Sequence, residues 1–197
     1  MVSTCWRNSG LANRCRKGGH FDECVAIAIE HLRDEDAIVV HSAAWALSHL
    51  GGDMAISALI EMRHNSDPDV RLAVAHGMQG SQREDAIATL IQLMDDAEDN
   101  VRDWATFELG TQCDVDTPEI REALRKRLDD SYEDARDEAI WGLAQRKEEP
   151  ALRELLVRLT AEEWKTGDEM AALEILGLKS DASVDELCEG LQKLLHP

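Results

Sequence analysis

A nine-residue pattern occurs four times in this chain and restricts its fold more than any other feature. The copies span residues 39–47, 70–78, 101–109 and 135–143, and their first residues lie 31, 31 and 34 positions apart. At 100° per residue, the apolar residues at positions 1, 5 and 9 of each copy share one side of a helix. A single helix cannot bury that side alone, so each copy must pack against its neighbours. The spacing therefore predicts a stacked array of helical units, an α-solenoid.

A second series of amphipathic segments lies between the copies and supplies the first helix of each unit. These segments span residues 21–33, 53–63, 84–94, 118–128 and 150–159. Asp67 and Thr117 each precede a proline, which is the usual order of a capping side chain and the first helical residue. Gly51, Gly80 and Gly110 follow second helices, where a residue in the left-handed conformation commonly ends the helix.

The repeat pattern weakens after residue 160, as expected where the last unit must cover an apolar face. Residues 169–176 can form a fifth second helix, and residues 184–195 can form a closing helix. Ser183 and Glu186 have the spacing of a capping box for that closing helix. The predicted fold is all-α: a right-handed α-solenoid of about five helix pairs plus a C-terminal capping helix.

Charge divides the chain into two parts. Residues 1–19 hold four basic and no acidic side chains and match nothing in the repeats, so we expect a flexible leader before one repeat domain over residues 20–197. The rest of the chain has 17 basic against 40 acidic residues, and the net charge is −19. Such a surface keeps an elongated molecule in solution, and it also repels phosphate and attracts basic proteins. We expect a basic protein partner and no direct nucleic-acid binding.

The cysteines and the hydropathy of the chain indicate a cytoplasmic protein. Five cysteines are an odd and scattered set that forms no disulfide framework, so reduced thiols are expected. No apolar run approaches the ~20 residues of a membrane span. The basic N-terminal residues lack the apolar stretch of a secretory signal. We therefore expect no association with a membrane.

The repeats resemble HEAT-like repeats of the short kind named after phycobilin lyases. The runs from Asp67 to Arg71 and from Val101 to Ala105, with Gly110 after Leu109, carry this resemblance, which covers about residues 21–178. It implies that the helix pairs are HEAT-like, and it implies little about function.

A closer resemblance spans residues 98–160. The runs from Val101 to Phe107 and from Glu138 to Lys147 are similar to bacterial stand-alone HEAT-repeat proteins. Some of those proteins are encoded beside Rhs-type polymorphic toxins and act as their immunity proteins. The resemblance implies that the chain binds and neutralises a toxin domain.

Enzymatic relatives with HEAT-like repeats fit this chain less well. Hydroxylases of the deoxyhypusine type hold two irons with repeated His-Glu pairs, and no histidine here is followed by glutamate. Alkylpurine DNA glycosylases present a basic surface to DNA, whereas this chain is strongly acidic. Bilin lyases and isomerases share the fold, but nothing in the sequence identifies a bilin pocket.

Position 7 of the copies holds a planar side chain each time: Trp45, His76, Phe107 and Trp141. This position lies 240° around the helix from position 1, and in a HEAT-type solenoid that side of the second helix lines the concave surface. Four such side chains could anchor a partner, because aromatic residues dominate binding hot spots. They could instead pack between adjacent second helices and set the curvature. Both readings remain open at the level of sequence.

Three acidic residues and a further tryptophan flank these side chains. Asp103 and Asp137 occupy position 3, and Trp104 and Glu138 occupy position 4. We expect these four residues to join the partner-binding surface. The position-2 arginines are expected to bond acids or helix ends of the next repeat; they are Arg71, Arg102 and Arg136.

The sequence contains no recognisable catalytic or metal constellation. Cys15, His20 and Cys24, with Cys5, have the residue types of a zinc site but match no established spacing. No nucleophile triad or phosphate-binding loop is evident, and we expect no enzyme activity, no cofactor and no metal.

We predict a non-catalytic binding module that captures a basic protein on its concave face, and the most specific form of this prediction is the neutralisation of a toxin. The alternative is a lyase-type or chaperone-like subunit that acts on a cofactor-bearing protein.

Overall fold

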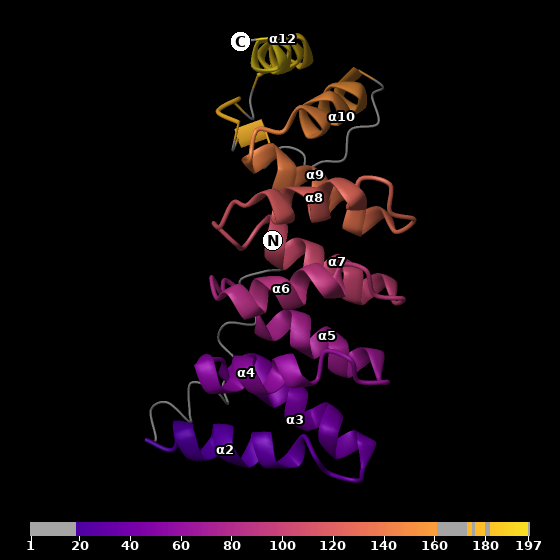
Figure 1. The fold of residues 1–197 in the computed structure, drawn as a ribbon. Coiled ribbons are helices and arrows are strands. Elements are labelled where there is room, and N and C mark those ends of the chain that lie inside the picture. The colour runs from indigo at the N-terminus through magenta and orange to yellow at the C-terminus, as the bar shows by residue number, and fades with distance from the viewer. Residues whose placement is uncertain (1–18, 161–172, 175, 180–181, 197) are drawn as a thin grey trace.

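The computed structural model describes residues 19–160, 173–174, 176–179 and 182–196, and within these residues the chain is helical with no strand. Figure 1 shows the helices stacked along one axis, with α2 at one end and α12 at the other. This arrangement confirms the predicted all-α solenoid. In chain order the helices are α2 (Phe21–His31), α3 (Ala37–Leu50), α4 (Asp53–Glu61), α5 (Pro68–Gly77), α6 (Glu84–Leu93), α7 (Asp99–Gly110), α8 (Pro118–Arg127), α9 (Glu133–Gln145), α10 (Glu149–Thr160) and α12 (Val184–Leu195).

The helices pair as the repeat pattern predicts. The first helices of four units are α2, α4, α6 and α8, and the second helices, which carry the pattern, are α3, α5, α7 and α9. The helix α10 begins a fifth unit, whose expected second helix at residues 169–176 lies mostly outside the described residues, as does the expected leader. The second helices pack against one another more extensively than the first helices do. None of the helices described is long and apolar enough to cross a bilayer.

Most of the capping predictions are confirmed. The side chain of Asp67 accepts a hydrogen bond from the backbone N–H of Asp69 at 2.9 Å, and Ser183 and Glu186 form the capping box of α12. Gly51 has a φ of 68°, in the left-handed region. The prediction for Gly110 is wrong, because this residue is the last of α7 and continues its helix.

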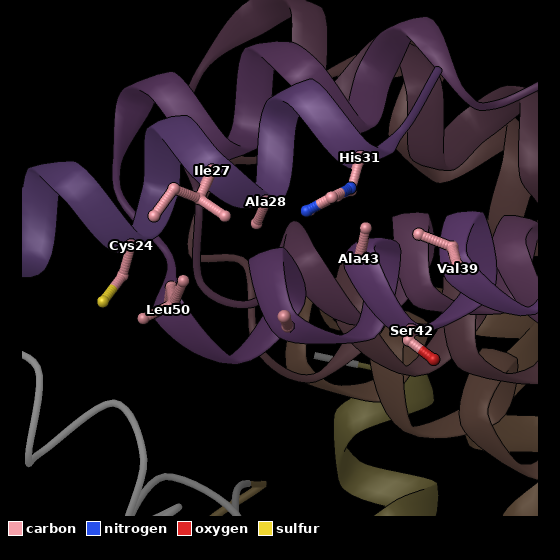
Figure 2. Close-up of a pocket in the computed structure, with 9 residues that line it drawn as sticks. Cys24, Ile27, Ala28, His31, Val39, Ser42, Ala43 and Leu50 are labelled. Carbon is pink, nitrogen blue, oxygen red and sulfur yellow. The ribbon is translucent and has the colours of Figure 1, made fainter. Parts of the chain in front are cut away.

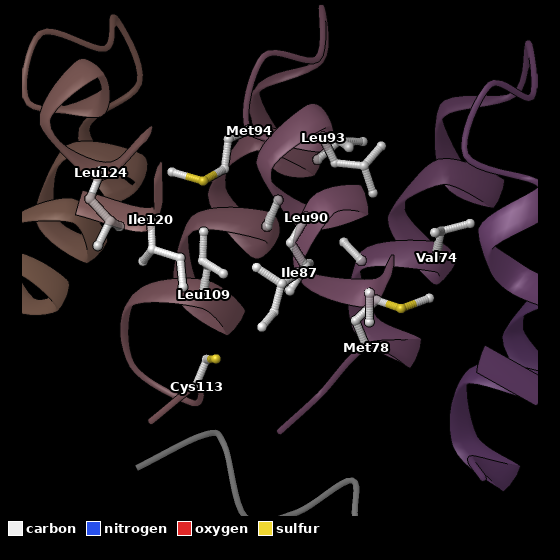
Figure 3. Packing of buried hydrophobic residues seen from close by; sticks show 14 of the residues in the cluster. Val74, Met78, Ile87, Leu90, Leu93, Met94, Leu109, Cys113, Ile120 and Leu124 are labelled. Atoms are coloured by element: carbon white, nitrogen blue, oxygen red, sulfur yellow. The ribbon is translucent and has the colours of Figure 1, made fainter. Parts of the chain in front are cut away.

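The core lies between the two layers of helices and follows the repeat positions. Position 9 is fully buried in every copy, and position 5 is buried throughout. Figure 3 shows Leu109 of α7 beside Ile120 of α8, with Leu124 beyond it, and Leu90 of α6 beside Ile87 in the same cluster of buried side chains. Each unit therefore buries its apolar side against its own pair and its neighbours, as a solenoid requires.

Two arginines at position 2 join neighbouring repeats, as predicted. Arg71 on α5 donates two hydrogen bonds to Asp96 at 2.7 and 2.8 Å, and Arg102 on α7 donates two to Asp130, both at 2.9 Å. Each aspartate lies in the turn between the two helices of the following unit. Arg136 on α9 instead donates to the carbonyl of Asp130, in the turn before its own helix.

The aspartates of these pairs also shape the turns in which they lie. The carboxylate of Asp130 accepts a hydrogen bond from the backbone N–H of Tyr132 at 2.9 Å. Burial opposes ionisation of Asp130, but the hydrogen bonds from Arg102 and Tyr132 and the nearby arginine charges outweigh it, and the pKa of Asp130 falls to about 2. This carboxylate is therefore charged throughout the physiological range and holds two repeats in register.

Glycines allow the second helices α7 and α9 to approach closely. A Cβ atom added to Gly142 would lie 2.6 Å from the Cα atom of Gly110. Backbone atoms cannot move aside as a flexible side chain can, so any larger residue at Gly142 must push the two helices apart.

We expect Gly142→Ala to destabilise the protein even though alanine favours helices. Overpacking costs about 1–3 kcal/mol, and the 2.6 Å approach to backbone atoms places this site in the upper part of that range. The gain in helix propensity is about 1 kcal/mol, so the net loss of unfolding free energy should reach about 2 kcal/mol. Gly190→Ala in α12 is the matched control, because the atoms nearest to its Cβ would belong to the flexible Leu178 side chain and not to a backbone. Urea unfolding measures both variants, and a Gly142→Ala protein as stable as the Gly190→Ala protein would contradict the close-packing account.

Candidate partner-binding face

A continuous row of rings crosses three successive second helices. Ring centroids of neighbours in this aromatic row lie between 5.2 and 6.5 Å apart. The row consists of His41, Trp45 and His49 on α3, His76 on α5, and Trp104 and Phe107 on α7. Its continuity depends on the side-by-side packing of α3, α5 and α7.

The predicted ring positions are brought together only in part. Trp45 and His76, both at position 7, are in contact with centroids 5.6 Å apart. The row then continues from His76 to Trp104 at position 4, at 5.2 Å, and Phe107 lies edge-on against Trp104 at 5.7 Å. Trp141 on α9 has no ring contact with any residue of the described part of the chain and packs against the core. A simple stack of the four position-7 side chains is therefore not formed.

His76 is the buried centre of the row. Only 9% of its surface is exposed, and Trp45, His49 and Trp104 surround its ring. Burial, together with the charge that His49 can carry, lowers the pKa of His76 to about 4. Burial also lowers the pKa of His49. His76 is therefore neutral at physiological pH and serves as a packing element between two tryptophans.

Phe107 differs from the tryptophans in what it rests on. Trp45, Trp104 and Trp141 are half-buried and pack against the hydrophobic core. Phe107 is also half-buried, but it lies against Trp104 and is not among the residues that pack on the core. Among the tryptophan and phenylalanine rings of the row, Phe107 is thus the one that does not pack on the core, and its half-buried ring is accessible to a partner.

The three predicted acidic residues have different surroundings. Asp137 forms an ion pair with Arg158 of α10 at 2.7 Å, and Glu138 accepts a hydrogen bond from the hydroxyl of Thr111 at 3.2 Å. Asp103 is half-buried on α7, and none of the residues in the described ranges forms an ion pair or hydrogen bond with its carboxylate. The carboxylate of Asp103 therefore has no compensating cation among the described residues, whereas that of Asp137 has Arg158.

The environment of Asp103 favours the arrival of a positive charge. Burial, followed by the negative charges of Asp134 and Asp130, raises the pKa of Asp103 to about 6. Asp103 and Phe107 are four residues apart on α7, so they share one side of the helix. A cation bound there would meet a carboxylate and an aromatic ring together.

Sequence reasoning missed two members of the row, His41 and His49. They lie four residues before and after Trp45, which is the spacing of neighbours on one helix face, so the signal was present in the sequence.

Nothing in the sequence indicated a second group, formed by His41, Asp67 and Asp69, whose potential metal-ligand atoms lie within 4.8 Å of one another. Asp67 already caps α5, and the group is partly exposed, so it is weak as a metal site.

We expect protonation of His76 to make stability depend on pH. In the unfolded chain the histidine gains its proton near pH 6.5, but in the folded chain only near pH 4, so lowering the pH from about 7 to about 5 should reduce the unfolding free energy by about 2 kcal/mol. Asp103 acts in the opposite direction, because its pKa is raised on folding. The contribution of His76 is therefore measured as the difference between the wild-type protein and His76→Gln.

Urea unfolding at the two pH values should show a smaller loss of stability for His76→Gln than for wild type. His64, which is exposed beyond α4, is the control, and His64→Gln should keep the wild-type pH dependence. If His76→Gln keeps it as well, His76 is not the buried neutral group described above.

Comparison with known proteins agrees with this architecture. The family model described as HEAT repeats matches residues 10–79 and 87–177. Protein YibA of Escherichia coli K12 is 34% identical over 84 residues, which cover 43% of this chain and 30% of YibA. The chain thus spans less than a third of that relative's length.

Two solved structures share the fold at low sequence identity. A designed armadillo repeat protein in complex with the peptide (KR)4 is 19% identical with a TM-score of 0.56, and the match covers 94% of this chain and 85% of that chain. A computationally designed armadillo repeat protein for modular peptide recognition is also 19% identical, with a TM-score of 0.50 and coverage of 93% and 84%. These two likenesses concern the fold. The family model matches most of the chain's length, and the chain therefore belongs to the HEAT-repeat family.

Proposed function

We propose that the face formed by α3, α5 and α7 binds an extended basic segment of another protein. The observation that carries this proposal is the placement of Asp103 and Phe107 on one side of α7. Asp103 is a carboxylate without a cation among the described residues, and Phe107 rests on another ring and not on the core. Repeat scaffolds of the HEAT and armadillo kind are suited to protein binding through such extended faces.

The chemistry of this pair suits a lysine or arginine side chain. A cation over an aromatic ring gains about 0.5–2 kcal/mol, and Asp103 adds a direct charge interaction. Because Asp103 is partly removed from water, its attraction for a cation is screened less than that of an exposed carboxylate. A bound cation also offsets the repulsion between Asp103 and the two aspartates Asp130 and Asp134.

The charge of the whole chain supports the same kind of partner. A net charge of −19 accelerates the encounter with a basic protein and disfavours a polyphosphate such as nucleic acid. The designed armadillo repeat protein with the (KR)4 peptide provides a precedent, since a fold of this kind was determined with a peptide of alternating lysine and arginine.

The proposal has a finer form. We infer that the chain acts by binding alone, without catalysis, and that its basic partner is a toxin domain which the bound chain covers. This form rests on the resemblance of residues 98–160 to immunity proteins. Growth rescue tests it: the chain should protect cells that produce a toxin encoded beside its gene, and Phe107→Ala should weaken that protection.

We expect Phe107→Ala and Asp103→Asn to weaken binding of a labelled peptide of alternating lysine and arginine. Truncation of a central aromatic contact costs about 2 kcal/mol, so Phe107→Ala should lose at least about tenfold in affinity. Asp103→Asn should lose about fivefold and should weaken the dependence of the association rate on salt. Fluorescence anisotropy and stopped-flow mixing at two salt concentrations measure these quantities.

The matched control is Asp22→Asn, because Asp22 is an exposed aspartate on the first helix α2. It removes the same formal charge and should change affinity less than about twofold. Urea unfolding of each variant separates binding from stability, and Phe107→Ala should lose more binding free energy than unfolding free energy. Equal affinities for wild type, Phe107→Ala and Asp103→Asn would refute the proposed face.

A further inference from the structure

An apolar groove lies between α2 and α3, at the end of the array where the first repeat has no described predecessor. Its volume is about 330 Å³. Figure 2 shows the groove, and its lining includes Cys24 and Ile27 from α2, and Val39, Ala43, Ala46 and Leu50 from α3. Ile27 is 55% exposed, and Ile38 on the same helix pair is 74% exposed. The terminal unit of a solenoid normally presents a polar outer surface, so an open apolar groove here requires an occupant.

The repeat positions identify the groove as a docking surface for a preceding unit. Position 8 is Ala46 in the groove, whereas two of its three equivalents in later copies, Gly77 and Gly142, lie against the preceding unit. An added Cβ would lie 3.3 Å from the Cα of Ser48 at Gly77, and 2.6 Å from that of Gly110 at Gly142.

Position 1 shows the same difference in burial. Val70 and Val101 are each 1% exposed, while Val39 is only half-buried and lines the groove. The first repeat thus has the surface that packs against the preceding unit in later repeats. No described residues form a preceding unit for the first repeat.

Charge and chain connectivity select the occupant. The helix pair around the groove is rich in exposed acids, among them Asp22, Glu23, Glu30, Asp34 and Glu35. A second copy of the chain would bring two such acidic ends together. Residues 1–18, which lead directly into α2, carry four basic and no acidic side chains and include the apolar Val2, Trp6 and Leu11. The match to the HEAT-repeat family model also begins within this segment, at residue 10.

We propose that residues 1–18 of this chain occupy the groove between α2 and α3 and provide the cover that a preceding repeat gives to each later one. This inference is independent of the proposed function, because it concerns the end of the array and not the aromatic row.

Limited trypsin digestion of the full chain tests the proposal, because the segment contains cleavage sites at Arg14, Arg16 and Lys17. Ile27→Glu places a charge in the groove at an exposed position and should speed cleavage at these sites by about fivefold or more. Met54→Glu is the matched control, since Met54 is 58% exposed on α4 and does not line the groove. Equal cleavage rates in wild type and both variants would overturn the proposal.

Alkylation of Cys24 provides a second test that does not depend on protease access. Deleting residues 1–18 should raise the rate of Cys24 modification several-fold and leave the rate at Cys188 on α12 unchanged, as followed by mass spectrometry. A synthetic peptide of residues 1–18 should restore protection in the deleted chain. An unchanged Cys24 rate, or protection in the full chain that disappears on dilution as a dimer dissociates, would overturn the proposal, the latter in favour of a second copy.

Discussion

Close contact between successive second helices is the constraint on which the rest of this structure depends. At Gly142 the backbones of α7 and α9 approach so closely that a single added carbon would lie 2.6 Å from Gly110. The arginine and aspartate pairs fix the same helices along their axes, since Arg102 reaches the turn of the next unit at Asp130. Small residues therefore set the spacing of the layer, and buried ion pairs set its register.

The aromatic row is a consequence of that spacing and register. Its rings come from three helices that are separated in sequence by about one repeat each, and yet neighbouring centroids lie within 6.5 Å. The row also accounts for the packing of this surface together with the binding that we propose for it. His76 is buried between two tryptophans and joins neighbouring helices of the layer. At the α7 end, Phe107 packs on Trp104 and not on the core, and Asp103 has no cation among the described residues.

Much of the fold could be predicted because it rests on local periodicity. The 31-residue spacing located the second helices, and the burial of position 9 in every copy follows from the helical period. Gly110 was misjudged because a glycine after a helical pattern has two uses, to end a helix or to admit a neighbouring backbone, and only the packing of α9 decides between them. The pairing of Arg102 with an acid of the next unit was predictable in kind, although the choice of Asp130 required the structure.

The candidate site was less predictable, because side-chain contacts between helices depend on their relative rotation. Sequence position alone suggested that Phe107 would follow His76, but Trp104 lies between them. The same limit applied to the acids, since Asp103 and Asp137 occupy the same repeat position. Only Asp137 has a described cation, supplied by Arg158 from α10. Because Asp103 on α7 has no described cation and Asp137 on α9 has one, the proposed site lies on α7.

Chemical-shift mapping of the tryptophan indole N–H groups tests the central claim most directly. During titration with a peptide of alternating lysine and arginine, the account predicts the largest shift at Trp104, which contacts Phe107 and follows Asp103 in α7, and a smaller shift at Trp45. The backbone signals of the first helices α4, α6 and α8 should remain nearly unchanged. Shifts confined to those first helices, with the indole of Trp104 unaffected at saturation, would contradict the assignment of binding to the second-helix face.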